Sequence, residues 1–364
     1  MREPQRTCVF CGAGGRLTGE HVFGDWLTRI GLDLSPSRHG AGPINRSARD
    51  LGVSRPFTRT VRDVCGSCNN GWMSNLEAVA SRVLSPFILG KAGSVSEKDA
   101  GAVVAWVQKT ALVGLLVSSE DDRTRGYGVR AHEYRALYEL RDEAAPLPAS
   151  QFWIGRHDGE QRLASVWVTP MVVKVNGLPE PDLPQAYVMT VVLGELLLHG
   201  VRFTAPGLQF DFKSADGFMQ AWPKAGPVSW PCGTTIDDRK FPRLSKGLNL
   251  VSLLPNVTLM PWRPAADLPP STADGPRVRL PTPCGEHFVF YPQALNLAGL
   301  SGDFYSFITS CECGKAYLVQ TEEDGAHFKA EGAGQAISDA YEALPGEEFV
   351  IEDDGGQFVF KAAR

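Results

Sequence analysis

The sequence predicts an α+β fold divided among more than one domain, and three observations lead to this prediction. The chain has 364 residues, which is more than one compact hydrophobic core usually contains. Apolar residues recur with helical spacing in several segments before residue 142 and with strand spacing in segments between residues 152 and 201. Two Cys-x-x-Cys pairs, Cys8/Cys11 and Cys65/Cys68, frame the first seventy residues and indicate a small metal-stabilised unit.

The composition is that of a globular protein without a membrane segment, with 43% hydrophobic and 21% charged residues. The sequence contains no run of about 18 apolar residues, the length a membrane span needs. Residues 1–6 lack the apolar core of a signal peptide. We therefore expect a cytoplasmic protein with no membrane partner, in which reduced cysteine pairs bind metal instead of forming disulfides.

Charge is distributed unevenly along the chain. Residues 1–70 contain ten arginines, no lysine and six acidic residues, a formal charge of +4. Residues 301–364 contain four basic and thirteen acidic residues, a formal charge of −9. Because guanidinium groups bind phosphate oxygens in pairs, the Arg-rich N-terminal stretch suits a nucleic-acid partner, although a charge of +4 is modest.

Residues 1–90 are predicted to form the first domain. Apolar spacing indicates a helix over residues 22–32, and a stretch rich in Ser, Pro, Gly and Arg indicates a loop over residues 33–58. A longer helix is expected from Asn69 to Leu84, because its apolar residues fall on one face. Pro86 is expected to end that helix.

Residues 94–260 are predicted to form an α+β middle domain of unassigned role. Ser96 and Asp99 resemble a capping box ahead of a helix that extends to about Leu115, and a shorter helix is expected over residues 131–142. The apolar period then changes to two, and a turn is expected at Gly194–Glu195. The predicted strands cover residues 152–154, 164–168, 171–175, 187–193 and 196–201.

The remaining chain is predicted as a linker and a third domain. Seven prolines between Pro261 and Pro283 predict an extended linker over residues 261–283. Residues 284–364 are predicted to form an acidic C-terminal α+β domain, with a helix near residues 335–344 and a terminal β-hairpin.

The two Cys-x-x-Cys pairs predict a structural zinc site made by Cys8, Cys11, Cys65 and Cys68. Four thiolates satisfy tetrahedral Zn²⁺, and each pair places two sulfur atoms toward one ion. Two identical spacings are hard to explain by unrelated buried cysteines. The segment between the pairs is longer than in short zinc ribbons, so it is expected to contain elements of its own.

Three segments resemble the HNH endonuclease family in its zinc-stabilised form. They are Cys8-Val9-Phe10-Cys11, then Leu17-Thr18-Gly19-Glu20-His21-Val22, then Cys65-Gly66-Ser67-Cys68-Asn69-Asn70-Gly71-Trp72-Met73. The resemblance covers roughly residues 5–80, and the later chain is more weakly similar to uncharacterised bacterial HNH proteins. It implies a ββα-metal unit, in which two strands and a helix hold a catalytic divalent ion.

The resemblance also implies a role for each site residue. His21 is the general base that takes a proton from water, a task that an unperturbed imidazole suits at neutral pH. Glu20 and Asn69 supply oxygen ligands to the divalent ion, for which Mg²⁺ or Mn²⁺ is expected. Asn70 and Asn75 are weaker alternatives to Asn69.

One position departs from the family pattern. The asparagine that usually orients the catalytic histidine, a few residues before the second cysteine pair, is replaced here by Thr60. Two substitutes remain open: Thr60 itself, through its hydroxyl or carbonyl, or Asn45 reaching in from the loop.

A second zinc site is a weaker prediction. Cys284 and His287 have C-x-x-H spacing, and Cys311 and Cys313 follow with C-x-C spacing. A Cys₃His site is chemically reasonable, and its expected role is to stabilise the C-terminal domain. The alternative is a set of ordinary buried thiols, of which Cys232 would be another.

The resulting functional hypothesis is a divalent-metal-dependent endonuclease that nicks or cleaves double-stranded DNA. A homodimer would allow both strands to be cut, and a role in phage defence or mobile-element biology follows from the resemblance alone. Two alternatives stay open: a non-catalytic zinc-dependent DNA-binding protein, and a nuclease or toxin that acts on RNA.

Overall fold

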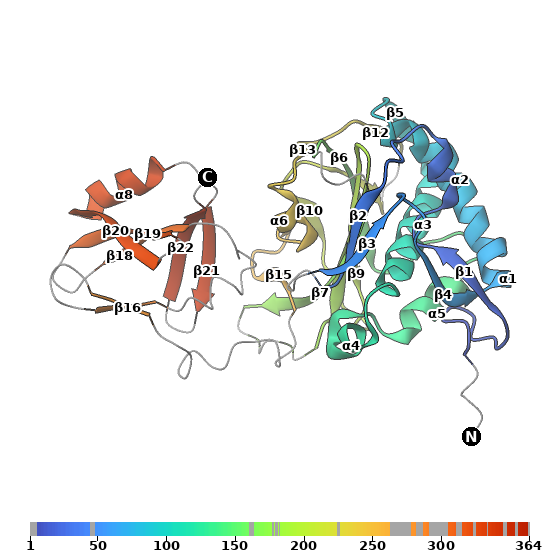
Figure 1. Cartoon of the computed structure of the whole chain (residues 1–364), viewed down its shortest axis with the longest axis horizontal. Coiled ribbons are helices and arrows are strands. Elements are labelled where there is room, and N and C mark those ends of the chain that lie inside the picture. Colours follow the sequence, from blue (N-terminus) through green and yellow to red (C-terminus); the bar gives the residue numbers. More distant parts are fainter. Residues whose placement is uncertain are drawn as a thin grey trace, which may run out of the picture. The chain divides into compact units, whose positions relative to one another are not determined.

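A computed structural model defines the fold (Figure 1). It describes residues 6–262 apart from 44–47, 160–163, 177, 179–180, 182 and 224–225, and then residues 278–281, 287–290, 305–310, 315–322, 325–332, 334–344, 348–353 and 356–362. The chain divides into two compact units, Met1–Pro264 and Ala265–Arg364. Among the described helices, none combines the length and the apolar character needed to cross a membrane.

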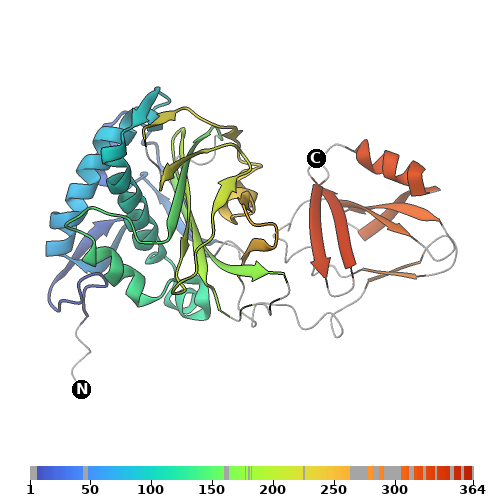
Figure 2. The ribbon, with the colours of Figure 1, turned by 180° about the vertical axis from the view of Figure 1, so that it is seen from behind.

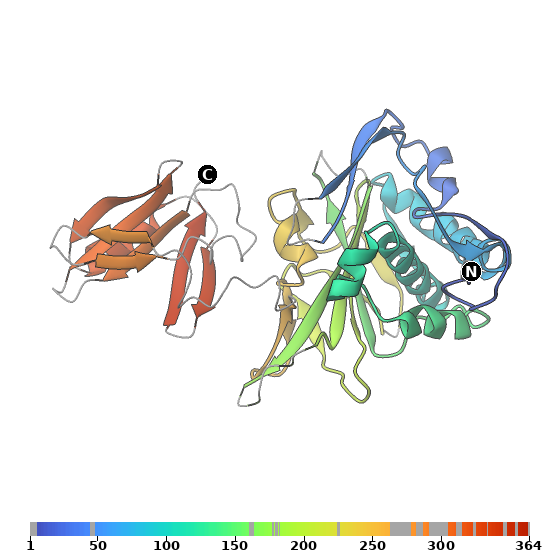
Figure 3. The same ribbon diagram turned by 60° about the horizontal axis from the view of Figure 1, so that its bottom comes forward.

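The first unit begins with two separate strand pairs. Strand β1 (Leu17–His21) pairs antiparallel with β4 (Thr60–Cys65), and β2 (Ser37–Ala41) pairs antiparallel with β3 (Arg49–Ser54). Figure 3 shows the β2–β3 hairpin as a blue ribbon apart from the main sheet. The prediction of a loop over residues 33–58 was therefore wrong, because the hairpin is largely exposed and lacks the apolar alternation that reveals a half-buried strand.

The segment between β1 and β2 contains less helix than predicted. Only a five-residue 3₁₀ turn, η1 (Asp25–Arg29), forms where a helix over residues 22–32 was expected. Its residues Trp26 and Leu27 are buried, so the apolar spacing reflects local packing and not a longer helix. Gly31 adopts a φ of +103°, a conformation that ends the turn.

A nearly continuous helical stretch follows β4. It consists of α1 (Gly66–Cys68), the π-turn η2 (Asn69–Met73) and α2 (Ser74–Ile88), with a kink at Gly71. The predicted helix is present, but Pro86 does not end it. Pro86 lies in the last turn of α2, where the backbone hydrogen bond that a proline cannot donate is lost only near the helix end. Phe87 and Ile88 are buried, and their packing favours two further helical residues.

Helix α3 (Glu97–Leu115) begins as predicted, since the Ser96 hydroxyl accepts a hydrogen bond of 3.2 Å from the Asp99 amide. The short strand β5 (Gly93–Val95) precedes it, and α4 (Glu120–Asp122), η3 (Arg123–Tyr127) and α5 (Ala131–Glu139) follow it. These elements belong to the same compact unit as β1 and α2.

A seven-stranded sheet forms the centre of the first unit. Its order is β11-β6-β9-β8-β7-β15, and β13 pairs with β6. The four long strands confirm the predicted change of period, and Gly194 with a φ of +53° forms the expected turn between β8 and β9. The strands are β6 (Ser150–His157), β7 (Ala164–Val175), β8 (Ala186–Leu193), β9 (Leu196–Phe203), β11 (Met219–Trp222), β13 (Thr235–Ile236) and β15 (Val257–Pro261).

Both faces of this sheet are covered. Alternate residues of β8 contribute to two hydrophobic clusters, Met189 and Val191 to one and Val188 and Val192 to the other. Helices α2 and α3 lie on one side of the sheet, and α6 (Phe241–Ser245) lies on the other (Figures 1 and 2). The smaller strands are β10 (Phe212–Ser214) with β14 (Leu250–Ser252), and β12 (Val228–Trp230) with β5.

The second unit contains a five-stranded sheet of order β20-β19-β18-β22-β21. Ile337 and Tyr341 of α8 (Gly334–Glu342) pack on Ala316 and Leu318, and the terminal hairpin β21–β22 confirms the prediction. The strands of this unit are β16 (Val278–Pro281), β17 (His287–Phe290), β18 (Tyr305–Ser310), β19 (Ala316–Glu322), β20 (Gly325–Gly332), β21 (Glu348–Asp353) and β22 (Gly356–Ala362).

Candidate functional site

The four cysteines of the two Cys-x-x-Cys pairs come together. The sulfur atoms of Cys8, Cys11, Cys65 and Cys68 all lie within 4.8 Å of one another. The Cys8–Cys68 and Cys11–Cys65 sulfur distances are 3.9 and 3.6 Å. A tetrahedral zinc ion with Zn–S bonds of about 2.3 Å separates its sulfur ligands by about 3.8 Å, so this cluster can hold a metal such as zinc.

The backbone around the first pair shapes the cluster. The amide of Gly12 donates to the Cys8 carbonyl at 2.8 Å, and the amide of Cys8 donates to the Ala13 carbonyl at 2.9 Å. Gly12 has a φ of +73°, which closes this tight loop without steric cost. The amide of Val9 donates to the Asp63 carbonyl on β4 at 3.0 Å and thereby joins the two cysteine pairs.

The environment of the thiols differs from one cysteine to the next. Burial raises the pKa of Cys68 above its ordinary range. Burial also acts to raise the pKa of Cys8, but backbone hydrogen bonds at Cys11, Cys65 and Phe10 outweigh it and lower that pKa to about 7. A thiolate is the form that binds metal, so the lowered pKa of Cys8 suits a ligand role.

Residues from the middle of the chain support the cysteine cluster. Phe10 contacts the rings of Trp72 and Tyr134 edge to face, with centroid distances of 5.5 and 5.3 Å. The Arg135 guanidinium of α5 donates to the Cys11 carbonyl. The cluster therefore packs against α5, which lies outside the first ninety residues.

The β1–β4 pair places Glu20 and His21 on opposite faces. Directly opposed residues of an antiparallel pair share a face, and Glu20 opposes Val61 while His21 opposes Thr60. Glu20 and Val61 are buried, whereas Thr60 is exposed and His21 is partly exposed. A β-bulge between Thr18 and Glu20 locally re-aims the strand.

Glu20 lies in a buried ion cluster that sequence reasoning did not identify. The Lys109 ammonium of α3 contacts Oε1 of Glu20 at 3.0 Å and Oε1 of Glu77 on α2 at 2.7 Å. The Lys109 side chain is fully buried, the Glu20 side chain is 4% exposed and the Glu77 side chain is 21% exposed. We call these three residues the Lys109 cluster.

Lys109 keeps its charge in this position. Burial alone would lower the pKa of Lys109, but attraction to Glu77 and Glu20 outweighs it, and the pKa is raised above its ordinary value. The sequence does contain a local sign of this cluster, because Gln108, Lys109 and Thr110 interrupt an otherwise apolar helix. A lysine buried at such a position requires a buried partner. The identity of the partners was not accessible, since Glu20 lies 89 positions away.

Asn69 faces β1 from the start of the helix. Its side-chain amide donates to the Thr18 hydroxyl at 3.2 Å and to the Gly19 carbonyl at 3.0 Å. The Thr18 hydroxyl donates its own hydrogen to the Val64 carbonyl, so it can only accept from Asn69. The amide nitrogen of Asn69 is therefore fixed toward β1, and its carbonyl oxygen is the remaining ligand atom.

The other predicted residues are placed less informatively. Asn70 and Asn75 are exposed, so Asn69 is the asparagine that contacts β1. Asn45 lies outside the described residues, as do Cys284, Cys311 and Cys313 and the side chain of His287. The thiol of Cys232 donates to the Ile154 carbonyl at 3.2 Å and takes no part in the four-cysteine cluster.

A cleft of about 600 Å³ lies beside the end of β1. Val22, which follows His21, lines it together with the β2–β3 hairpin, α3 and β7. Arg38 and Arg59 also line the cleft, where Arg38 pairs with Asp50 at 2.6 Å and Arg59 donates to the Leu51 carbonyl at 3.1 Å.

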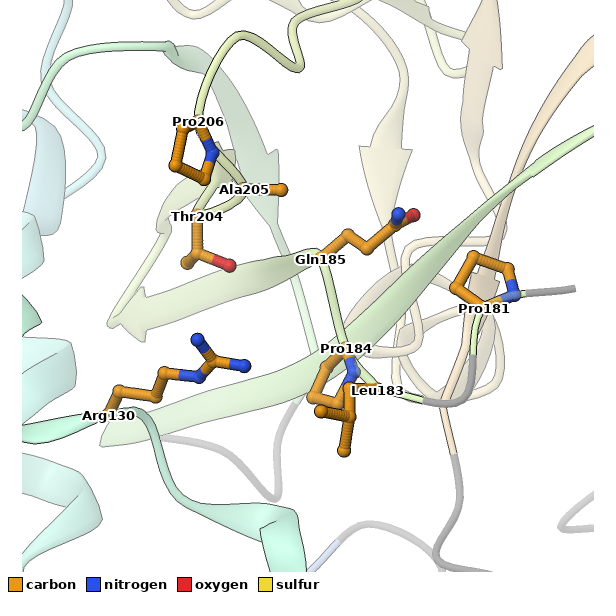
Figure 4. A pocket seen from close by; sticks show the side chains of 8 residues that line it. All are labelled: Arg130, Pro181, Leu183, Pro184, Gln185, Thr204, Ala205 and Pro206. Carbon is orange, nitrogen blue, oxygen red and sulfur yellow. The ribbon is translucent and has the colours of Figure 1, made fainter.

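A second pocket, of about 320 Å³, lies away from these residues (Figure 4). Among the described residues that line it, Arg130 is the one that carries a charge, and three prolines form much of the wall. Its described lining includes none of the residues predicted to carry chemistry.

Comparison of the chain with protein-family models, curated protein sequences and solved structures gives no significant match.

Proposed function

We propose that this protein is a zinc-stabilised, divalent-metal-dependent nuclease. Its proposed site lies at the His21 end of β1 and at Asn69, which begins the π-turn η2 after β4. One observation carries the proposal: Asn69 is hydrogen-bonded to the backbone of β1 at Gly19, next to Glu20 and His21. Two antiparallel strands followed by a helix, with these residues at their junction, suit the ββα-metal arrangement. The cysteine cluster would hold the strand and the helix together.

His21 is the proposed general base. It lies on the partly exposed face of β1, where a water molecule and a phosphodiester can approach it. Thr60 stands directly opposite on the same face and is the residue proposed to orient the imidazole. Arg62, exposed on the same strand, supplies a guanidinium for a phosphate group.

The residues present fit a divalent ion. The amide nitrogen of Asn69 is committed to β1, which leaves its carbonyl oxygen as a ligand. Lys109 contacts Oε1 of Glu20, and no described residue donates a hydrogen bond to Oε2. Glu20 and Asn69 would therefore hold Mg²⁺ or Mn²⁺, which in such sites stabilises the charge that develops during phosphodiester hydrolysis.

DNA is the proposed substrate, with RNA as the alternative. This choice is supported by the ten arginines of the first seventy residues, two of which, Arg38 and Arg59, line the cleft beside Val22, because guanidinium groups suit a nucleic-acid backbone. Cleavage of both strands would need a second copy of the chain or repeated nicking. The cytoplasm is the proposed compartment, since it keeps thiols reduced for zinc.

One observation favours a second candidate function. The Glu20 carboxylate is nearly fully buried and already paired with Lys109, which also suits a structural role. A zinc-dependent DNA-binding protein without catalysis would retain the cysteine cluster and the ion cluster but would not need His21.

Supercoiled plasmid nicking separates these functions. Full-length protein is incubated with plasmid, or with single-stranded RNA, in Mg²⁺ or Mn²⁺. His21→Ala should abolish nicking while bound zinc, measured by elemental mass spectrometry, stays at the wild-type level. His132→Ala is the matched control, because His132 is a half-exposed histidine of α5 that the proposed site does not include.

The outcomes are distinct. Brief chelation should stop nicking before zinc is lost, and added Mg²⁺ should restore it. Nicking that persists in His21→Ala would remove His21 as the base. Binding without cleavage under all metal conditions would favour the DNA-binding protein, and cleavage confined to RNA would change the substrate.

A further inference from the structure

The Lys109 cluster places a protein-borne cation directly behind the proposed catalytic residues. Glu20 precedes His21 on β1, Glu77 lies on the helix that begins near Asn69, and Lys109 belongs to α3. One ammonium therefore joins three elements that surround the site, with contacts of 3.0 and 2.7 Å to the two carboxylates.

The charges of the cluster do not balance. Two carboxylates and one ammonium leave a formal charge of −1 at a position where Glu20 and Lys109 are almost inaccessible to water. Glu77, which is 21% exposed, can be partly solvated, whereas Glu20 cannot. Buried charge without a counter-charge is strongly unfavourable, so Lys109 balances the buried Glu20 carboxylate and the surplus negative charge falls on the partly solvated Glu77.

The geometry points to Lys109 as a positioning residue that shares Glu20 with the divalent ion: it fixes the carboxylate through Oε1 and limits the negative charge that the ion meets. This inference rests on the proposed nuclease function. If Lys109 positions Glu20, then α3 is part of the proposed site, and the first ninety residues do not contain all of its residues. Lys109 acts through Glu20 and touches neither substrate nor water.

Two effects of removing Lys109 oppose each other, and their sizes decide the prediction. Loss of an outer partner that orients a ligand usually weakens metal binding by roughly ten- to hundredfold. Loss of a positive charge beside a divalent cation strengthens binding by more than this, even at an effective dielectric constant of about 20. Lys109→Met should therefore bind the divalent ion more tightly and cleave more slowly.

The test measures affinity and turnover separately. Mn²⁺ binding to the full-length zinc-loaded protein is followed by electron paramagnetic resonance, and plasmid nicking is followed at saturating Mn²⁺. We expect Lys109→Met to bind Mn²⁺ at least tenfold more tightly and to nick at least tenfold more slowly, with zinc unchanged. Lys98→Met, an exposed lysine on the same helix, should match the wild type in both measurements.

A double variant keeps the test decisive if Lys109→Met folds poorly. Lys109→Met combined with Glu77→Gln restores a formal charge of −1, because Glu20 alone remains ionised. Mn²⁺ affinity should then return to within about threefold of the wild type, while nicking stays slow because nothing fixes Glu20.

Three results would overturn the inference or its basis. Unchanged or weaker Mn²⁺ binding by Lys109→Met would show that Lys109 does not share a carboxylate with the ion. Normal nicking by the double variant would show that Lys109 serves folding alone. A wild-type protein that neither binds Mn²⁺ nor nicks DNA would remove the nuclease function itself, an outcome separate from both.

Discussion

The two ends of the β1–β4 pair are stabilised in opposite ways. At the Leu17 end, Cys65 and its three partner cysteines form a cluster that can hold a metal ion. At the His21 end, Lys109 already supplies a positive charge between Glu20 and Glu77. The first end can take an external cation, whereas the second carries its own, and the proposed catalytic ion would come in addition to it.

Disruption of the four-cysteine cluster should have the largest effect on the stability of the first unit. Cys68→Ser removes a buried sulfur ligand, and structural zinc sites contribute on the order of 10 kcal/mol of binding free energy to folding. We expect loss of bound zinc and a thermal unfolding transition of the first unit that is broadened and lowered. Cys232→Ser is the control, and equal zinc loss in both variants would argue against the four-cysteine cluster.

Disruption of the Lys109 cluster should have the second-largest effect on stability. Lys109→Met leaves two carboxylates without their buried partner, which typically costs about 3–5 kcal/mol. Urea unfolding monitored by circular dichroism measures this, and adding Glu77→Gln should recover a large part of the loss. A loss below about 1 kcal/mol in the single variant would show that the cluster contributes little to stability.

The same contrast explains what could be predicted from sequence. The four-cysteine cluster is encoded by two short motifs, and the sheet by a clear change of period, so both were predicted. The ion cluster depends on residues 89 and 32 positions apart, and only the fold brings them together. The β2–β3 hairpin was missed because its strands are exposed, and the five-residue η1 because local packing imitates a helical pattern.

The stability of a third region, the sheet core, should depend on pH. His199 on β9 is fully buried, and burial lowers its pKa to about 3. Its folded pKa lies below the unfolded value of about 6.5, so stability is complete above that value and falls as pH drops toward 3.

Between pH 7.5 and pH 5 this histidine should cost about 2 kcal/mol of unfolding free energy. Urea unfolding at the two pH values measures it, and His199→Gln should flatten the dependence. An equally steep dependence in His199→Gln would assign the effect to other groups.

The smallest effect is expected from an exposed pair that joins the same two helices as Lys109. Arg82 on α2 contacts Asp99 on α3 at 2.6 Å, but the Arg82 side chain is 62% exposed. Solvent screening should limit the effect of Arg82→Ala to about 0.5 kcal/mol in urea unfolding. A loss as large as that of Lys109→Met would mean that burial does not explain the importance of the lysine end.

Anomalous diffraction from crystals of the full chain grown with Mn²⁺ would locate both cations in one measurement. The predicted result is zinc at the four cysteines and manganese bound by Glu20 and Asn69, with Lys109 still on Glu20 and His21 on the neighbouring face. Manganese in the place of the Lys109 ammonium, or bound away from Glu20 and Asn69, would contradict the proposed site.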